Sequence, residues 1–256
     1  MNIISFSGGK DSVATVILCH IHNIQVDEII FSEVMFDDEI SGELPEHINF
    51  IKNVAFPKFE EWGFKTKILR SNITFMDCFN HIVTRSSVPE RNGKRAGFPM
   101  GGKCRINGDC KLKPIKEYIR KLKSEGEVIQ FIGIAIDEPE RLERLKEDQR
   151  SILAEFEHDE QMAYELAEEH NLLSPIYTFA PRGGCWFCPN ARDGELRNLR
   201  NNHPELWQTL LDLENEEDII GDVFDTRKRR SIHQEEERLY WEAQQMTIFD
   251  YLEKEI

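Results

Sequence analysis

Hydrophobic residues in the first 170 positions of the chain follow two alternating patterns. Short apolar runs that are typical of buried strands begin near residues 2, 28, 65 and 128. Between these runs, apolar residues recur every three or four positions, which indicates helices. The pattern predicts strands over 2–6, 28–36, 65–69 and 128–136, and helices after residue 12 and over 45–62, 75–83, 113–123 and 142–170 (one or two acidic helices). Alternating strands and helices predict an α/β fold with a doubly wound parallel sheet.

The other segments have weaker patterns. Residues 84–110 are rich in Gly, Pro, Arg and Asn and predict a long irregular loop, a kind of segment that is often functional. An extended segment over 173–179, a cysteine-containing knuckle over 181–190, a helix over 204–214 and a charged helical end follow. We therefore expect one α/β domain over 1–180, and a knuckle with a helical C-terminal extension over 181–256.

A glycine-containing turn follows the first predicted strand. It consists of Ser7, Gly8, Gly9, Lys10, Asp11 and Ser12. Two glycines allow a tight turn with outward N–H groups, and the next helix presents its positive N-terminus. With the serine hydroxyls and the Lys10 ammonium, this turn predicts a cradle for phosphate or pyrophosphate, with Lys10 and Asp11 as catalytic candidates. The spacing of the turn differs from that of a Walker loop. The alternative to a phosphate cradle is a plain strand-to-helix turn.

This hexapeptide, placed after an N-terminal strand, resembles the PP-loop of the ATP-pyrophosphatases. Three further segments resemble the phosphoadenosine phosphosulfate (PAPS) reductase branch of that group: Phe36-Asp37-Asp38, Cys110 to Ile115, and Gly133 to Arg141. The resemblance covers roughly residues 1–190. It implies an adenine nucleotide alpha hydrolase-like fold that binds ATP, PAPS or APS, with Mg²⁺.

The resemblance also extends the expected nucleotide site. Asp37 or Asp38 would hold Mg²⁺ or a ribose hydroxyl, and Gly133 and Arg141 would lie beside phosphate or sulfate. The alternatives are a solvated helix cap for the two aspartates and a solvated helix face for Arg141.

The expected reaction depends on a cysteine that this chain lacks. Reductases of the family attack sulfate with a thiol near the C-terminus, whereas the last cysteine here is Cys188. We therefore expect adenylation-dependent sulfur transfer or related nucleotide chemistry. One alternative is a PAPS or APS reductase that uses an external thiol. Another is a non-catalytic adaptor that binds nucleotide or nucleic acid.

Four of the six cysteines lie in glycine-rich loops: Cys104, Cys110, Cys185 and Cys188. Four thiolates suit structural zinc or an iron–sulfur cluster. The resemblance to APS reductases favours a 4Fe-4S cluster slightly over Zn²⁺. Unrelated surface cysteines and a redox disulfide between Cys185 and Cys188 are the alternatives. Cys19 and Cys78 lie in apolar patterns and are expected in the core.

The charge of the chain narrows the classes of partner that it could bind. The formal net charge of the 256 residues is −15, which argues against a general nucleic-acid binder. Residues 81–123 nevertheless hold twelve Lys and Arg against three acidic residues, a local net of +9 that leaves −24 elsewhere. This segment could face an anionic ligand or nucleic acid, or simply form a solvated loop.

Two further expectations concern partners and location. The stretch Gln245–Phe249 resembles the short peptide by which bacterial proteins bind the replication sliding clamp, although the same spacing could cap the core. No apolar run approaches the roughly 20 residues of a membrane span, and no signal-peptide pattern begins the chain. A cytoplasmic protein is therefore expected.

Overall fold

The chain forms two compact units. The computed structural model describes residues 1–99, 104–222, 224 and 230–252, with residues 246–252 described by their backbone alone. The first unit combines 1–75 with 106–185, and the second combines 76–105 with 186–256. The second unit thus includes residues 76–105, which the sequence pattern places within the first domain.

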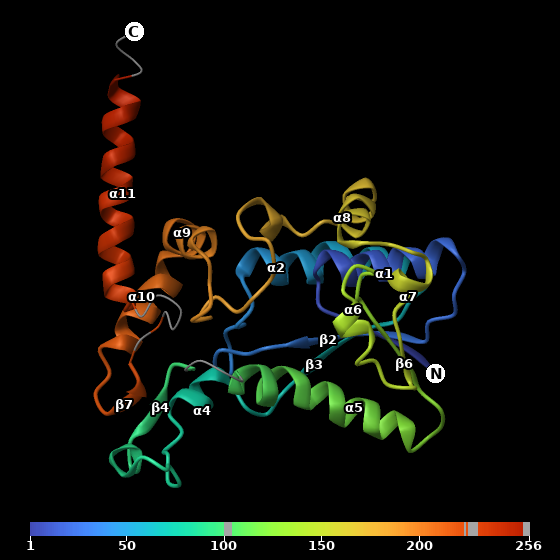
Figure 1. Ribbon diagram of the computed structural model, residues 1–256, viewed down its shortest axis with the longest axis horizontal. Coiled ribbons are helices and arrows are strands. Elements are labelled where there is room, and N and C mark those ends of the chain that lie inside the picture. Colours follow the sequence, from blue (N-terminus) through green and yellow to red (C-terminus); the bar gives the residue numbers. More distant parts are fainter. Residues whose placement is uncertain (100–103, 223, 225–229, 253–256) are drawn as a thin grey trace. The chain divides into compact units, whose positions relative to one another are not determined.

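A five-stranded parallel sheet is the centre of the first unit (Figure 1). The strand order is β3-β2-β1-β5-β6, and every neighbouring pair is parallel. The strands are β1 (Asn2–Phe6), β2 (Glu28–Glu33), β3 (Thr66–Arg70), β5 (Ile129–Ile132) and β6 (Gln149–Arg150). Along the chain, β2 and β3 are added on one side of β1, and β5 and β6 are then added on the other side. This confirms the predicted α/β class with a parallel sheet.

Successive strand residues point to opposite faces, and both faces are covered by helices. Ile4, Phe6 and Phe31 pack into a large core beneath α1 and α8, whereas Ile3 and Ile30 pack against α5. The helices of this unit are α1 (Lys10–Ile21), α2 (Pro45–Phe50), α3 (Phe56–Glu61), α5 (Lys113–Lys123), α6 (Pro139–Leu142), α7 (Ile152–Glu155) and α8 (Glu160–Glu169). Figure 1 shows α1, α2, α7 and α8 on one face and α5 on the other.

The predicted helix over 45–62 contains a local widening. A π-helical turn, Ile51–Ala55, separates α2 from α3. Pro57 lies at the start of α3 and has no N–H, and its ring would clash with the carbonyl four residues earlier in a regular helix. The wider turn therefore keeps the segment helical through the proline.

Several predicted boundaries are wrong because tertiary contacts override the local pattern. The fourth strand ends at Ile132 instead of residue 136, since the chain meets the start of α1 at Gly133. The predicted acidic helices over 142–170 are interrupted by β6, which pairs with β5 at the sheet edge. The side chains of Ser151 and Asp159 cap two separate helices there. The segment predicted to be extended forms a 3₁₀ turn, Pro175–Thr178.

The second unit contains helices and one small sheet. Its strands β4 (Arg95–Gly97) and β7 (Ile219–Gly221) are parallel, and β4 lies within the predicted irregular loop. Its helices are α4 (Phe75–Phe79, which begins at the unit boundary), α9 (Asp193–Asn202), α10 (Pro204–Glu214) and α11 (Ile232–Leu252). Ion pairs hold α11 in place: Arg200 binds Glu236 through two hydrogen bonds of 2.7 Å, and Trp207 donates to the same carboxylate.

Within the part of the chain that the structure describes, no helix is both long enough and apolar enough to span a bilayer.

Candidate functional site

The predicted phosphate turn lies at the carboxyl end of β1. Since β2 follows β1 on one side of the sheet and β5 lies on the other, the turn is at the point where the strand order reverses. Ligands of open α/β sheets bind at such switch points. The fold therefore places Ser7–Ser12 where a ligand site is expected.

Gly8 and Gly9 have different roles in the turn. Gly8 has a φ of +77°, a conformation that favours glycine, and a Cβ there would lie 2.6 Å from the His47 ring. Gly9 has an ordinary φ of −79°, and a Cβ there would lie 3.3 Å from the Tyr177 hydroxyl. Only Gly8 thus meets the expected conformational need, whereas at Gly9 a Cβ would be tight against the Tyr177 hydroxyl.

The two serines tie the turn together. The hydroxyl of buried Ser12 donates to the Gly9 carbonyl at 2.9 Å and accepts from the Ser7 N–H at 3.2 Å. The Ser7 and Ser12 hydroxyl oxygens are 3.1 Å apart. These contacts lie within the turn and shape it, whereas Lys10 lines the cavity in front of the turn.

His47, on α2, contacts the turn and supports it. It is 2% exposed, its Nε2 lies 2.9 Å from the Ser7 carbonyl oxygen, and its Nδ1 lies 3.0 Å from the Ser174 hydroxyl. A carbonyl only accepts, so Nε2 carries a proton. Burial lowers the pKa of His47, which keeps the ring neutral, and Nδ1 therefore accepts from the Ser174 hydroxyl.

A cavity of about 390 Å³ opens in front of the turn, and we call it the loop cavity. It is lined by Ser7, Gly9, Lys10, Asp11, Glu43, His47, Lys111, Glu138, Arg141, Glu160, Tyr177, Pro181, Arg182 and Gly183. Four of these side chains are cations and four are carboxylates. The cavity therefore brings the turn together with Arg141, which the sequence also selected, and with residues that it did not select.

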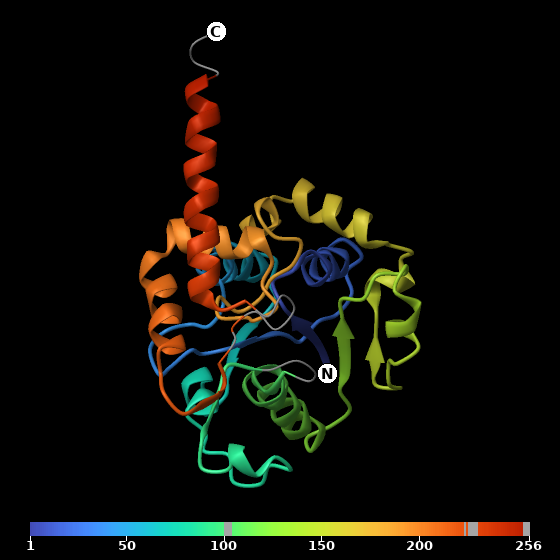
Figure 2. The same ribbon diagram turned by 60° about the vertical axis from the view of Figure 1, so that its left-hand side comes forward.

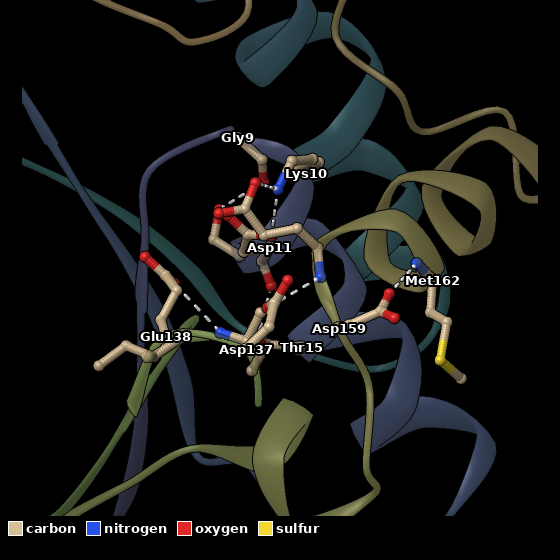
Figure 3. A network of polar contacts seen from close by, with 12 residues as sticks. Gly9, Lys10, Asp11, Thr15, Asp137, Glu138, Asp159 and Met162 are labelled. Carbon is tan, nitrogen blue, oxygen red and sulfur yellow. Dashed lines mark hydrogen bonds and ion pairs between the residues drawn. The ribbon is translucent and has the colours of Figure 1, made fainter. Parts of the chain in front are cut away.

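The Lys10 ammonium is held by two carboxylates. It lies 2.8 Å from Oδ1 of Asp11, its neighbour in the chain (Figure 3), and 3.0 Å from Glu160 Oε2 at the start of α8. Burial alone would lower the pKa of Lys10, but hydrogen bonds and charge attraction from Asp11 and Glu160 raise it. Burial raises the pKa of Asp11, and the nearby charges of Glu160 and Glu138 add to this rise against the effect of Lys10.

The first N–H group of α1 is also paired. The Lys10 backbone N–H donates to the Tyr177 hydroxyl at 2.8 Å. The first N–H groups of a helix have no partner within the helix, and they are the groups that bind anions in phosphate loops. The Tyr177 oxygen therefore lies where a ligand oxygen would accept the same hydrogen bond.

Other charges of the loop cavity are paired in the same way. The Arg141 guanidinium contacts the Glu138 carboxylate, and the Lys111 ammonium lies 3.6 Å from Glu43 Oε1. The charge of buried Glu43 raises the pKa of Lys111 despite the opposing effect of burial. Carboxylates thus hold these cations at positions where an anionic ligand could pair with them instead.

Gly133 lies behind the turn. A Cβ at this position would lie 2.8 Å from the Asp11 carbonyl carbon and the Ser12 nitrogen. Glycine therefore lets the end of β5 approach the backbone of the turn closely, and its role here is packing.

The remaining predicted residues lie apart from the loop cavity. The Asp37 carboxylate accepts the N–H groups of Glu39 at 2.9 Å and Ile40 at 2.7 Å, so it caps its own turn, and Asp38 is exposed. Among the described residues, neither aspartate lines this cavity.

The four candidate metal ligands divide between the units. Cys110 and Cys185 belong to the first unit, and Cys104 and Cys188 belong to the second. Cys110 is buried, Cys104 is exposed, and the other two are half-buried. Over the described ranges, no group of three or more His, Cys, Asp or Glu side chains is placed to hold a metal ion.

Three other expectations have different outcomes. Cys19 and Cys78 are buried, as predicted, and burial raises the pKa of the Cys19 thiol to about 12. The segment 81–123 spans both units, and its residues 100–103 lie outside the described residues. The backbone of Gln245–Phe249 belongs to α11, but its side chains from Met246 onward lie outside the described part.

Comparison with known proteins gives two distant relatives. The chain matches no known protein-family model. It is 23% identical over 216 residues to the uncharacterized protein MJ0066 of Methanocaldococcus jannaschii, covering 80% of this chain and 40% of that protein. It is 25% identical over 219 residues to the uncharacterized protein MJ0973 of the same organism, covering 82% and 46%. The chain thus spans less than half the length of these relatives.

Proposed function

We propose that the loop cavity binds the phosphate groups of a nucleotide, either ATP or an adenylyl sulfate such as PAPS or APS. The observation that carries this proposal is the Lys10 backbone N–H, which faces the cavity at the start of α1 beside the Lys10 ammonium. A phosphate oxygen would replace the Tyr177 hydroxyl at this N–H group and the Glu160 carboxylate at the ammonium. The proposal extends to an adenine nucleotide alpha hydrolase-like fold of the PAPS reductase family and to a cytoplasmic enzyme.

Lys10 would supply the electrostatic part of the chemistry. In adenylation, an acceptor attacks the α-phosphorus, the bond to the pyrophosphate oxygen breaks, and pyrophosphate leaves with the electron pair. The Lys10 ammonium and the N-terminus of α1 would stabilise the negative charge that grows on the phosphate oxygens. Adenylation-dependent sulfur transfer is the reaction class that we favour.

The acidic residues of the loop cavity fit a metal that arrives with the nucleotide. Mg²⁺ is commonly held by one or two carboxylates together with substrate phosphates, instead of by a complete protein cage. The Asp11 carboxyl has a raised pKa from burial and from the charges of Glu160 and Glu138. A cation near Asp11 would relieve that repulsion and would supply charge neutralisation for the phosphates.

The test is nucleotide binding with a matched pair of lysine variants. We expect Lys10→Gln to weaken ATP binding by about tenfold or more, because a charge-assisted hydrogen bond contributes about 1.5–3 kcal/mol. Lys58→Gln is the control, since Lys58 is a surface lysine that also pairs with a carboxylate, Glu61. Isothermal titration calorimetry with ATP, PAPS and APS measures both variants. Equal affinities for the wild type and Lys10→Gln would contradict the proposal.

Turnover assays separate the proposed reaction from its alternatives. Pyrophosphate release from ATP would support adenylation. Sulfite release from PAPS or APS with thioredoxin would instead indicate a reductase that uses an external thiol. Nucleotide binding without turnover, together with nucleic-acid binding that falls steeply with salt, would indicate an adaptor.

The metal hypothesis for Cys104, Cys110, Cys185 and Cys188 stays a prediction, and metal analysis tests it. We expect protein purified without oxygen to absorb near 400 nm and to contain about four irons and four sulfides, as in a cubane held by four thiolates. A colourless protein with one zinc would make the site structural. A protein with neither metal would reject both forms of the hypothesis.

A further inference from the structure

A second cavity lies on the face of the sheet that α5 covers, between this helix and the strands β5 and β6. Its volume is about 510 Å³, and it shares no lining residue with the loop cavity. We call it the α5 cavity. Figure 2 shows α5 beside the arrows of these two strands. Neither the phosphate turn nor the proposed nucleotide chemistry uses this space.

The sheet topology explains why the cavity is open. α5 packs with Ile119 and Leu122 against Ile3 and Ile30, so it covers the part of the sheet that β1 and β2 form. On the same face, Gln130 and Ile132 of β5 lie beside Ile3 and Ser5 of β1 in register. Ser5, Gln130 and Ile132 face the space next to the helix and form the floor of the α5 cavity.

The cavity has an apolar wall and a polar row. Leu112, Ile115 and Ile119 recur at helical spacing along α5 and its preceding turn, and Leu112 is 39% exposed. Across the floor, Gln149 Nε2 donates to Gln130 Oε1 at 2.9 Å, and Gln130 Nε2 donates to Ser5 Oγ at 2.5 Å. A ligand here would therefore meet apolar surface on one side and hydrogen-bonding groups on the other.

The rim of the cavity is positively charged. Four cations line it, namely Lys116, Arg120, Lys123 and Lys146, against a single carboxylate, Asp148. Lys123 pairs with Asp148. Within the described residues, Lys116, Arg120 and Lys146 make no ion pair, and Lys116 and Arg120 lie one helical turn apart on the same side of α5. This differs from the loop cavity, where carboxylates hold several cations.

We infer that the α5 cavity binds a small organic anion with an apolar body. Its size is within the usual range for ligand pockets, about 300–1,000 Å³. The apolar body would cover Leu112, Ile115 and Ile119, and the anionic group would pair with Lys116 and Arg120. An inorganic anion would leave the apolar wall exposed, and a neutral hydrophobic molecule would desolvate the cations without compensation.

The test uses the fluorescent probe 1-anilinonaphthalene-8-sulfonate, a sulfonate on an aromatic body, with the complete chain. We expect saturable binding of one probe molecule, displaced by dodecanoate but not by inorganic phosphate. The double variant Lys116→Gln/Arg120→Gln should bind the probe about tenfold more weakly, because each exposed charge pair contributes up to about 1 kcal/mol. Leu112→Glu, which places a negative charge on the exposed part of the apolar wall, should also weaken binding.

Two controls make the result specific. Lys113→Gln/Lys121→Gln removes the same charge from exposed positions of α5 that do not line this cavity, so it should leave binding unchanged. Lys10→Gln should also bind the probe normally, which separates this site from the proposed nucleotide site. Thermal melts check that each variant is folded. Equal weakening by both double variants, or no saturable binding by the folded wild type, would overturn the inference.

Discussion

Replacing Gly8 with alanine is expected to weaken nucleotide binding, because the phosphate turn would have to shift, and to lower the stability of the protein clearly. A Cβ at Gly8 would lie 2.6 Å from the His47 Cε1 and Ile51 Cδ1 atoms, on a backbone with a φ of +77°. The left-handed conformation costs a non-glycine residue about 1–2 kcal/mol, and overpacking of a buried site typically adds about 1–3 kcal/mol. We expect a total loss of about 2–5 kcal/mol in the free energy of unfolding, measured by urea denaturation.

Gly63 provides the matched control for this prediction. It has a φ of +87°, but no atom lies within 4 Å of the position that a Cβ would take. Gly63→Ala should therefore cost only the conformational part, about 1–2 kcal/mol. It should also leave ATP affinity unchanged. If both variants lost the same stability and Gly8→Ala kept full ATP affinity, the close packing of the turn on His47 would have no functional role.

Replacing His47 with glutamine is expected to change how stability depends on pH. The pKa of buried His47 lies below its ordinary value of 6.5, so the unfolded chain binds this proton more readily than the folded chain. The stability from neutral His47 is present above pH 6.5 and is lost as the pH falls below it. The loss should be about 1.4 kcal/mol for each pH unit until the folded pKa is reached.

Urea denaturation at pH 7.5 and pH 5.5 measures this effect. His47→Gln should be less stable than the wild type at pH 7.5 by about 1–3 kcal/mol, because Ser7 or Ser174 loses a buried partner. The free energy of unfolding should change less between these two pH values in the variant than in the wild type. His81→Gln, at an exposed position, should keep the wild-type pH dependence. An unchanged pH dependence in His47→Gln would show that His47 does not titrate between these pH values.

The sequence predicted the parts of the site that are local in the chain. The six residues of the turn are contiguous and follow an apolar strand, so their composition and their position at a strand end could be recognised together. Arg141 was also selected, and it lines the same cavity. The parallel sheet could be predicted because buried parallel strands have continuous apolar runs.

The residues that complete the site could not be selected from local patterns. His47, Glu160 and Tyr177 contact the turn from positions 40, 150 and 167 residues away from their partners. His47 and Glu160 lie in helical segments whose pattern is ordinary, and Tyr177 lies in a segment whose pattern predicted extended backbone. The only signal for His47 was a histidine within an apolar helix face, which most often indicates a buried structural residue. β6 was missed for a related reason, since two residues are too few to show a period.

The division of the chain into units has a consequence for its synthesis on the ribosome. The strand β4 emerges early, with the segment 76–105, whereas its partner β7 lies near residue 220. At about 5–20 residues per second, this partner follows on the order of ten seconds later. All strands of the central sheet have been synthesised by residue 150. The first unit can therefore assemble before β7, the partner of β4, has been synthesised. A nascent chain that stops after residue 185 would therefore expose β4, which makes this strand the natural place to look for chaperone binding during translation.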